Sequence, residues 1–576
     1  MKKLMLGNEA VARGAYEAGV RVVSSYPGTP STEITECMAK FDNVFVEWAT
    51  NEKVACEVAI GASIGGARSM TCMKHVGLNV CADPVFTASY TGVTGGMVIC
   101  VADDPGMHSS QNEQDSRHYA RAAKIMMLEP SDSRECLEYT KKAFELSEKF
   151  DTPVMIRLST RVSHSQSLVT ESPREEIPVK AYEKNVPKYV MMPGYAKMRH
   201  TVVEERMNKI REFAATTELN TVEINSKEIG VITSGTSHVY AKEAFGDKVS
   251  YLKLGMVYPL SKELISDFVS KHTAVYVIEE LDPVIEEQIL AMGILVNGKK
   301  HFTLEGEYSA QYLRNKVLFE DAPAHAMQDE AVPARPPVMC AGCPHRGAFY
   351  VLKKLGLTVS GDIGCYTLGA VAPLDSIDST ICMGASVSAL HGFLQAQGKD
   401  AKAVAVIGDS TFLHSGITGL IDIVYNKGNA TVIILDNSIT GMTGHQNNPA
   451  TGYTIRGEET AAVDLEALVR AIGIKRVTVA DPFDVKKFES IVKAEVNTDE
   501  PSVIIAQRPC ALLKTCKYEG NYVINDKCKN CRMCMKLGCP AISVLDDKVV
   551  IDKNQCNGCG LCINVCPFGA IEKEEN

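Results

Sequence analysis

The chain has 576 residues, of which 45% are hydrophobic and 23% charged, and its formal net charge at pH 7 is −10. This length predicts several domains, and the composition is ordinary for a globular protein. The acidic balance argues against nucleic acid as a partner, since phosphate binding needs a basic surface. No apolar run reaches the roughly 18 residues of a membrane helix, and the amino terminus lacks a signal-peptide pattern. We therefore expect a cytoplasmic protein that binds neither nucleic acid nor membranes.

Composition and periodicity change three times along the chain. The first segment alternates helical stretches rich in Gly and Ala with short apolar strands such as Met97–Ala102 and Val154–Leu158, which is an α/β pattern. A polar linker and an amphipathic helix then lead into a second, smaller α/β segment. A Pro- and Ala-rich break at 332–337 precedes a third α/β segment, and a cysteine-rich tail follows. The boundaries that we expect are residues 1–165, 166–330, 331–516 and 517–576.

Three glutamates, Glu47, Glu52 and Glu57, lie in a stretch of the first segment that is otherwise rich in small and apolar residues. Glu52 is predicted to begin a helix that runs into Gly65 and Gly66. A carboxylate among such residues is typical of acid–base sites. The first turn of a helix also favours a carboxylate for electrostatic reasons, so a structural role is the alternative.

Other polar residues of the first segment follow predicted strands. The turn around Thr29 is typical of a strand end that leads into a helix cap. Lys74 and His75 come directly after a later predicted strand, Ser69–Met73. His75 is a candidate contact for a substrate or cofactor, or else a buried structural histidine. Asp115 and Arg117 are a further charged pair in this segment.

In the third segment, oxygen-bearing side chains follow two strands. Asp409 comes after the first, and Asn437 lies 28 positions further on, at the end of the second. Because the carboxyl ends of parallel strands meet at one edge of a sheet, the two side chains are candidate ligands of one Mg²⁺. The pattern resembles the thiamine diphosphate signature GDG…NN, with Ser410 replacing its second glycine and Asp436 its first asparagine. An ordinary strand end is the alternative. The residues that we expect to bind the cofactor are Gly408, Asp409, Ser410, Asn437 and Ile439.

Eight of the twenty cysteines lie in the tail, in two runs that each end in Cys-Pro. Disulfides are not expected in a reducing compartment. Spacings of two residues let neighbouring thiolates bind one corner of a cubane cluster, and the distant fourth cysteine completes the other cluster. Zinc is the alternative, but the number of cysteines and the lack of histidine in the tail favour two 4Fe–4S clusters, as in bacterial two-cluster ferredoxins. One set is Cys528, Cys531, Cys534 and Cys566, and the other is Cys556, Cys559, Cys562 and Cys539.

Four further cysteines, Cys340, Cys343, Cys365 and Cys510, are spaced unlike either run of the tail. From spacing alone they are either structural or the ligands of a third cluster that the fold assembles.

Over essentially all 576 residues the chain resembles the 2-oxoacid:ferredoxin oxidoreductases, most clearly in the fused ferredoxin tail, the CAGCPHR block and the YPGTPSTEI opening. The resemblance implies an α/β fold with two thiamine diphosphate-binding domains, pyrimidine-type at 1–165 and pyrophosphate-type at 331–516. It also implies a transketolase C-terminal-like domain between them and a two-cluster ferredoxin domain at the end. Thiamine diphosphate, Mg²⁺ and two 4Fe–4S clusters are the implied cofactors, and Cys340, Cys343, Cys365 and Cys510 align with ligands of a proximal third cluster.

The resemblance also assigns roles in the first segment. Glu52 aligns with the glutamate that activates thiamine, and Thr29 with a threonine that contacts the substrate. His75 faces the cofactor in related folds, and Asp115 and Arg117 lie near the position of an arginine that binds the oxoacid carboxylate.

The most similar members of the family oxidise aryl pyruvates, such as indolepyruvate, to arylacetyl-CoA and CO₂, with coenzyme A as co-substrate and ferredoxin as electron acceptor. They work with a smaller beta subunit, which implies an α₂β₂ heterotetramer, and their low-potential clusters fit an anaerobe. The alternatives are the same chemistry on pyruvate or phenylpyruvate, a decarboxylase without redox function, and a non-catalytic electron-transfer scaffold.

Overall fold

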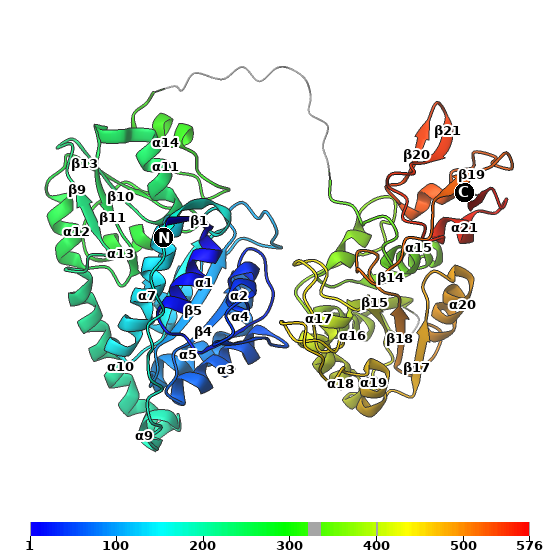
Figure 1. The fold of residues 1–576 in the computed structure, drawn as a ribbon, viewed down its shortest axis with the longest axis horizontal. Coiled ribbons are helices and arrows are strands. Elements are labelled where there is room, and N and C mark those ends of the chain that lie inside the picture. Colours follow the sequence, from blue (N-terminus) through cyan, green and yellow to red (C-terminus); the bar gives the residue numbers. More distant parts are fainter. Residues whose placement is uncertain (1, 321–335, 399–400, 575–576) are drawn as a thin grey trace. The chain divides into compact units, whose positions relative to one another are not determined.

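The computed structural model describes residues 2–320, 336–398 and 401–574. These residues belong to two units, Met1–Gln328 and Asp329–Asn576, each built on a parallel sheet (Figure 1). Most of the Pro- and Ala-rich break expected at 332–337 lies outside the described residues. Within the described part of the chain, no helix is both long and apolar enough to span a bilayer.

A seven-stranded sheet forms the centre of the first unit, in the order β12-β6-β7-β5-β4-β2-β3. Six strands run parallel, and β12 pairs antiparallel with β6 at one edge. The inner strands are buried along their whole length, as expected for a parallel sheet with helices on both faces. The strands are β2 (Val22–Ser25), β3 (Phe45–Trp48), β4 (Ser69–Lys74), β5 (Met97–Asp103), β6 (Met127–Leu128), β7 (Val154–Ser159) and β12 (Met256–Tyr258).

Helices connect these strands and cover the sheet. Helix α3 begins after Asn51, whose side chain caps it by accepting a hydrogen bond from the backbone of Val54. A short antiparallel pair, β1 (Lys2–Leu6) with β8 (Gln166–Thr170), lies outside the sheet. The helices are α1 (Gly7–Glu17), α2 (Thr32–Met38), α3 (Glu52–Ile64), α4 (His75–Val80), α5 (Ala82–Thr91), α6 (Arg117–Ala123), α7 (Ser133–Phe150), α8 (Thr160–His164), α9 (Val186–Tyr189) and α10 (Pro193–Ala214).

A second, four-stranded sheet completes the first unit, in the order β13-β10-β11-β9. Since β12 follows β11 but joins the seven-stranded sheet, the smaller α/β part and the larger one share backbone hydrogen bonds. Its elements are β9 (Thr221–Glu223), β10 (Ile229–Thr233), α11 (Gly235–Phe245), η1 (Gly246–Lys248), β11 (Ser250–Lys253), α12 (Lys262–Val269), β13 (Ala274–Ile278), α13 (Val284–Ala291) and α14 (Ala310–Val317).

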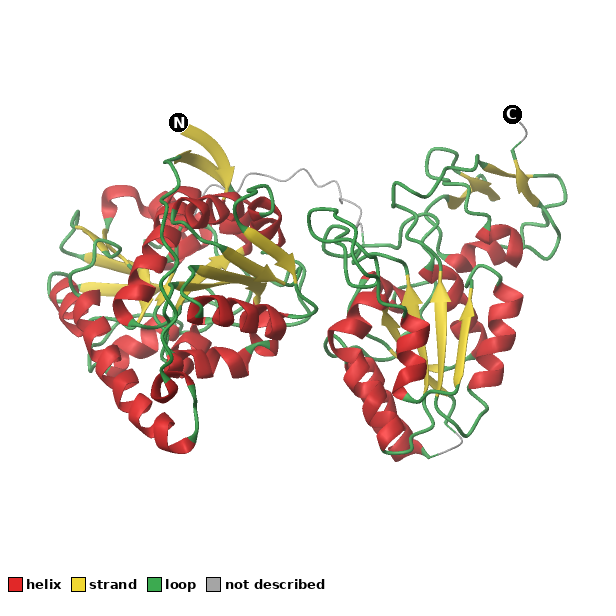
Figure 2. Ribbon diagram, turned by 60° about the horizontal axis from the view of Figure 1, so that its bottom comes forward, coloured by secondary structure: helices red, strands yellow, loops and turns green. Residues whose placement is uncertain are grey.

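The second unit is centred on a five-stranded parallel sheet, in the order β14-β15-β16-β18-β17, with helices on both faces (Figure 2). Two of its inner strands, β15 and β16, are fully buried and end in Gly408 and Asp436, so the predicted cofactor residues begin where these strands stop. The elements are α15 (His345–Leu355), β14 (Thr358–Ser360), η2 (Cys365–Ala370), α16 (Ala385–Gln397), β15 (Ala403–Gly408), α17 (Asp409–Thr411), η3 (Phe412–Gly416), α18 (Ile417–Tyr425), β16 (Thr431–Asp436), α19 (Leu465–Ile472), β17 (Arg476–Ala480), α20 (Val485–Glu495) and β18 (Ser502–Gln507).

The cysteine-rich tail belongs to this second unit and packs against its core through Leu537, Leu561 and Val565. It contains two small antiparallel pairs, β19 with β22 and β20 with β21. Its elements are β19 (Tyr522–Ile524), η4 (Met533–Leu537), β20 (Ile542–Leu545), β21 (Lys548–Ile551), α21 (Leu561–Val565) and β22 (Ile571–Lys573). The α/β class predicted from the sequence is confirmed.

Candidate functional site

Of the three candidate glutamates, Glu52 alone is fully buried. It is the first residue of α3, only 4% exposed, and its side chain lies against Gly77 of α4. A Cβ atom at position 77 would lie 2.6 Å from Glu52 Oε1, so only glycine leaves room for this carboxylate. Glu47 is half-buried and accepts a hydrogen bond from Ser24, whereas Glu57 is exposed and pairs with Lys53.

Lys74 and His75 occupy the end of β4 and the start of α4, next to Glu52. Lys74 Nζ donates a hydrogen bond to the backbone of Ser109 at 3.0 Å. Burial lowers the pKa of Lys74, although the carboxylates of Asp104 and Glu52 favour its charged form. Burial likewise lowers the pKa of His75, so the imidazole stays neutral at pH 7. The stem of Lys74 approaches Gly28, which places the half-buried Thr29 in the same region.

Asp115 and Arg117 lie elsewhere, in a buried ion-pair network. The Arg117 guanidinium pairs at 2.6 Å both with Asp115 and with Glu279 at the end of β13. Burial would raise the pKa of Asp115, but Arg117 and Arg157 outweigh it and hold that pKa well below its usual range. Because carboxylates of the chain itself occupy this guanidinium, the geometry favours a structural role over the expected contact with an oxoacid.

In the second unit, three oxygen-bearing groups converge at the ends of β15 and β16. The Asn437 side-chain amide lies 3.2 Å from Asp409 Oδ1 and 2.7 Å from the backbone oxygen of Ile439. With its nitrogen toward these oxygens, the amide donates to both. With the amide turned over, its oxygen would join the other two as a candidate ligand of a Mg²⁺. The residues present therefore fit the predicted cation.

The environment of the Asp409 carboxylate also favours a bound cation. The side chain is 2% exposed, and burial together with the Asp436 carboxylate raises its pKa to about 7. Its side chain accepts a hydrogen bond from Asn448 at 3.3 Å. A divalent cation would supply the missing positive charge. Ser410, next in the chain, accepts a hydrogen bond from Thr440 at 3.0 Å and so fixes the following loop.

A nearby buried carboxylate, Asp362, was not singled out by the sequence analysis. It accepts hydrogen bonds of 2.8–2.9 Å from the backbone nitrogens of Ile363, Gly384 and Ser386, at the start of α16. A Gly-Asp pair after β14 was the signal in the sequence, since the same pair follows β15. Lys74 is the other residue without an assigned role, and its position directly after a strand was the available signal.

The four dispersed cysteines lie next to this site. A Cβ on Gly441 would be 3.5 Å from Cys365 Sγ and 3.7 Å from Asn437 Nδ2, and the backbone nitrogen of Cys510 donates to Asn437 O at 2.9 Å. Burial, together with the thiols of Cys510 and Cys340, raises the pKa of Cys365 to about 11. Burial similarly raises the pKa of Cys343 to about 12, with contributions from Cys365 and Cys340. The fold thus brings together four cysteines that are up to 170 positions apart in the sequence.

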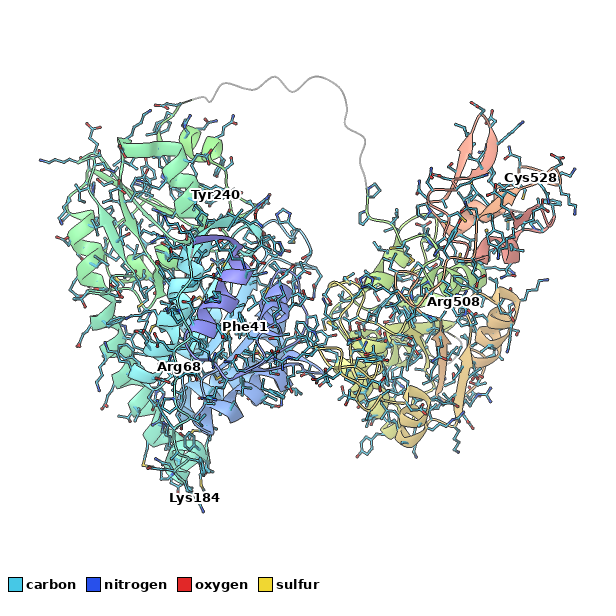
Figure 3. The ribbon with its side chains drawn as sticks, in the orientation of Figure 1. Phe41, Arg68, Lys184, Tyr240, Arg508 and Cys528 are labelled. Atoms are coloured by element: carbon cyan, nitrogen blue, oxygen red, sulfur yellow. The ribbon has the colours of Figure 1, made fainter. Side chains whose placement is uncertain are left out.

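The eight tail cysteines line two small cavities, four to each. One cavity is lined by Cys528, Cys531, Cys534 and Cys566, and the other by Cys539, Cys556, Cys559 and Cys562. These are the two sets that the spacing predicts. Figure 3 labels Cys528 in the tail and Arg508, after β18, in the body of the unit.

Across residues 2–320, 336–398 and 401–574, no three His, Cys, Asp or Glu side chains are arranged to hold a single metal ion. In a cubane cluster each cysteine binds a different iron, so its thiolates stand further apart than the ligands of one ion. The cavities lined by four cysteines fit clusters of this kind.

Three family models match the chain. "Pyruvate flavodoxin/ferredoxin oxidoreductase, thiamine diP-bdg" covers residues 13–230, "Thiamine pyrophosphate enzyme, C-terminal TPP binding domain" covers 362–506, and "4Fe-4S binding domain" covers 549–572. Fold and site together define an oxidoreductase chain that binds thiamine diphosphate and iron–sulfur clusters.

Curated relatives narrow this class. Indolepyruvate oxidoreductase subunit IorA of Archaeoglobus fulgidus is 41% identical over 99% of this chain and 97% of its own length. Its counterpart from Pyrococcus horikoshii is 40% identical with the same coverage of both chains. The 2-oxoglutarate synthase subunit KorA of Methanothermobacter thermautotrophicus is 32% identical over 33% of this chain and 56% of its own length. The chain belongs to the family of indolepyruvate oxidoreductase subunit IorA.

Proposed function

We propose that this chain is the catalytic subunit of an enzyme that oxidatively decarboxylates aryl pyruvates, in particular indolepyruvate, and passes the electrons to ferredoxin. The observation that carries the proposal is the combination, in one chain, of an oxygen cluster at strand ends with cavities lined by four cysteines. The substrate is proposed from the names of the relatives. The domain limits at 165, 330 and 516 are proposed with it.

Thiamine diphosphate, when bound, supplies the carbanion chemistry that breaks the bond to the carboxylate carbon. Glu52 is proposed to hold and exchange a proton with the pyrimidine ring, because it is a buried carboxylate at a helix start with room made by Gly77. Asp409, Asn437 and the backbone oxygen of Ile439 are proposed to hold the Mg²⁺ that the diphosphate needs, with Gly408 and Ser410 beside it.

Substrate contacts are proposed in the first unit. Lys74 is a buried cationic side chain whose pKa is influenced by the nearby Glu52 carboxylate. Its positive charge is proposed to bind the carboxylate of a 2-oxoacid. Thr29 and the neutral imidazole of His75 border the same region and are proposed to contact the substrate.

Electron transfer is proposed to run within the second unit. Each turnover forms a thioester with coenzyme A, releases CO₂ and yields two electrons, which two one-electron acceptors take up. The cysteines beside Asn437 are proposed to hold a first cluster, and the two sets in the tail the next two. A smaller beta subunit in an α₂β₂ assembly, external ferredoxin and coenzyme A complete the proposed system.

The test is an anaerobic assay of the chain in complex with its smaller subunit, comparing indolepyruvate, phenylpyruvate and pyruvate. We expect ferredoxin reduction that depends on coenzyme A, with the highest kcat/KM for an aryl pyruvate. Release of CO₂ without ferredoxin reduction would instead identify a non-redox decarboxylase. Clusters that reduce and reoxidise in a complex that releases no CO₂ would identify an electron-transfer scaffold.

A further inference from the structure

Arg346, the second residue of α15, is a buried arginine for which the proposed function has no role. It is 2% exposed. Its guanidinium donates hydrogen bonds to backbone oxygens on two segments that are nearly 200 residues apart in the chain. On one side these are Cys340, at 3.1 Å, and Met339; on the other they are Leu537, at 2.9 Å, and Gly538, at 2.5 Å.

These two segments belong to two different cysteine sets. The first carries Cys340 and Cys343, and the second leads directly into Cys539 of the tail. Arg346 itself lines the cavity of the tail set Cys539, Cys556, Cys559 and Cys562, together with Ala341 and Gly342. The guanidinium therefore lies where the two sets meet.

The first of these segments also packs closely against the tail through Asn557, next to Cys556. Asn557 Nδ2 donates to Ala341 O at 3.2 Å. Gly342 has a φ of +71°, and a Cβ there would lie 2.0 Å from Asn557 Nδ2, so the contact requires glycine. The position of Arg346 between the sets is thus fixed by tight packing.

A buried guanidinium needs a negative partner, since losing water without one is costly. None of the ion pairs within 4 Å among the described residues involves Arg346. Burial lowers the pKa of Arg346, and the groups that favour its charged form are the thiols of Cys539, Cys343, Cys340 and Cys559. Arg346 shares its cavity with Cys539, Cys556, Cys559 and Cys562, and these cysteines carry negative charge once they bind a cluster as thiolates.

We propose that Arg346 is a positioning residue that raises the reduction potential of the cluster held by Cys539, Cys556, Cys559 and Cys562. Reduction adds one negative charge to a cluster, so a fixed cation in a site of low dielectric constant stabilises the reduced form more than the oxidised form. The inference rests on the cluster assignments of the proposed function.

The other tail cluster is an internal reference. The cationic side chains that line its cavity include Lys529 and Arg532, both on the surface, and Arg532 is about half exposed. Water screens such charges. Loss of Arg346 is therefore expected to change the potential of one tail cluster and leave that of the other in place.

The experiment is a redox titration of the anaerobic full-length chain, followed by electron paramagnetic resonance, with iron content measured on each sample. Arg346→Gln is expected to shift the reduction equilibrium of one tail cluster at least tenfold toward the oxidised form. This shift corresponds to a potential lower by about 59 mV for one electron. Arg346→Lys keeps the charge and is expected to keep most of the potential. Arg508→Gln is the matched control: its charge acts on Cys559 but is a third exposed and pairs with Asp481, so less than a threefold change is expected.

Unchanged potentials in Arg346→Gln at full iron content would overturn the proposal and leave the cluster assignments standing. A wild-type chain with fewer than two tail clusters would overturn those assignments, and this inference with them. If Arg346→Gln loses iron, Arg346→His replaces it. The potential of one tail cluster should then fall as the histidine loses its proton with rising pH, and a potential without that pH dependence would overturn the proposal.

Discussion

At the scale of single residues, the buried carboxylates Glu52, Asp362 and Asp409 differ in how their charge is compensated. Asp362 accepts three backbone hydrogen bonds of 2.8–2.9 Å, so the fold itself satisfies it. Asp409 accepts a bond of 3.3 Å from Asn448, and burial together with the Asp436 carboxylate raises its pKa to about 7. Glu52 lies against a glycine. A bound cation would offset the charge of Asp409.

Glu52→Gln tests the proposed proton exchange. The amide has the same shape, so thiamine diphosphate should remain bound, but it neither takes up nor returns a proton. We expect exchange of the thiamine C2 proton, followed by deuterium incorporation, to fall at least 100-fold. Glu57→Gln on the same helix is the matched control and should exchange at the wild-type rate, because that side chain is exposed. Normal exchange in Glu52→Gln would move the role to Glu47.

Asp409→Ala tests the cation site. Diphosphate and Mg²⁺ bind as one unit, so loss of an anionic ligand should weaken both. Calorimetric titration with thiamine diphosphate at fixed Mg²⁺ should show at least a tenfold weaker Kd, about 1.4 kcal/mol, partly restored at high Mg²⁺. The visible iron–sulfur absorbance should stay unchanged, and Asp422→Ala, which removes an exposed carboxylate from α18, should bind normally. Normal binding by Asp409→Ala would place the cofactor elsewhere.

At the scale of elements, a buried ion pair ties α6 to the end of β13. Arg117 pairs with Glu279 at 2.6 Å and also donates to the backbone oxygens of Glu280 and Asp282. Burial raises the pKa of Glu279, although Arg117 opposes this. The two α/β parts of the first unit are therefore joined by charge as well as by the β12–β6 pairing.

Arg117→Met is expected to destabilise this junction by about 3–5 kcal/mol, because it leaves Glu279 buried without its cation and Asp115 with only the more distant Arg157. Hydrogen exchange of the α6 and β13 amides measures the local opening free energy. Arg121→Met, on the same helix, removes an exposed pair with Glu287 and should cost less than about 1 kcal/mol. Equal protection of both variants would show that the buried network contributes little.

Strands and helices of this chain could largely be predicted from local patterns. The apolar runs at β5 and β7 are predicted within one residue of their observed ends, since burial on both faces leaves a continuous apolar signal. The pairing of β12 with the larger sheet could not be predicted from local patterns, because its partner strand β6 lies more than 120 positions away in the sequence. Arg117 and Asp115 were likewise assigned from their types, and only the fold shows that Glu279 faces them.

At the scale of the whole molecule, cysteines illustrate the same limit. The sets in the tail follow from spacing alone, because each run is local and its fourth member lies at a fixed distance. The four dispersed cysteines are brought together by three different loops, and sequence spacing carries no information about that. Their role as cluster ligands therefore stays a prediction.

Iron content tests this prediction. Three 4Fe–4S clusters require about twelve irons per chain, and the tail alone about eight. We expect about twelve in the anaerobic protein, about eight in Cys365→Ser, and about twelve in Cys382→Ser, which changes an exposed cysteine of the same segment. About eight irons in the wild type would show that the proximal cluster is absent and that the protein holds only the two tail clusters.

The strand β12 also bears on how the chain can be divided for expression. A fragment that stops near residue 165 would leave β6 as an open sheet edge and Arg117 without Glu279. Unpaired edge strands recruit further chains, so such a fragment is expected to aggregate. Gene fusions, tags and cleavage sites therefore belong beyond the smaller sheet, after α14, where both parts of the first unit remain together.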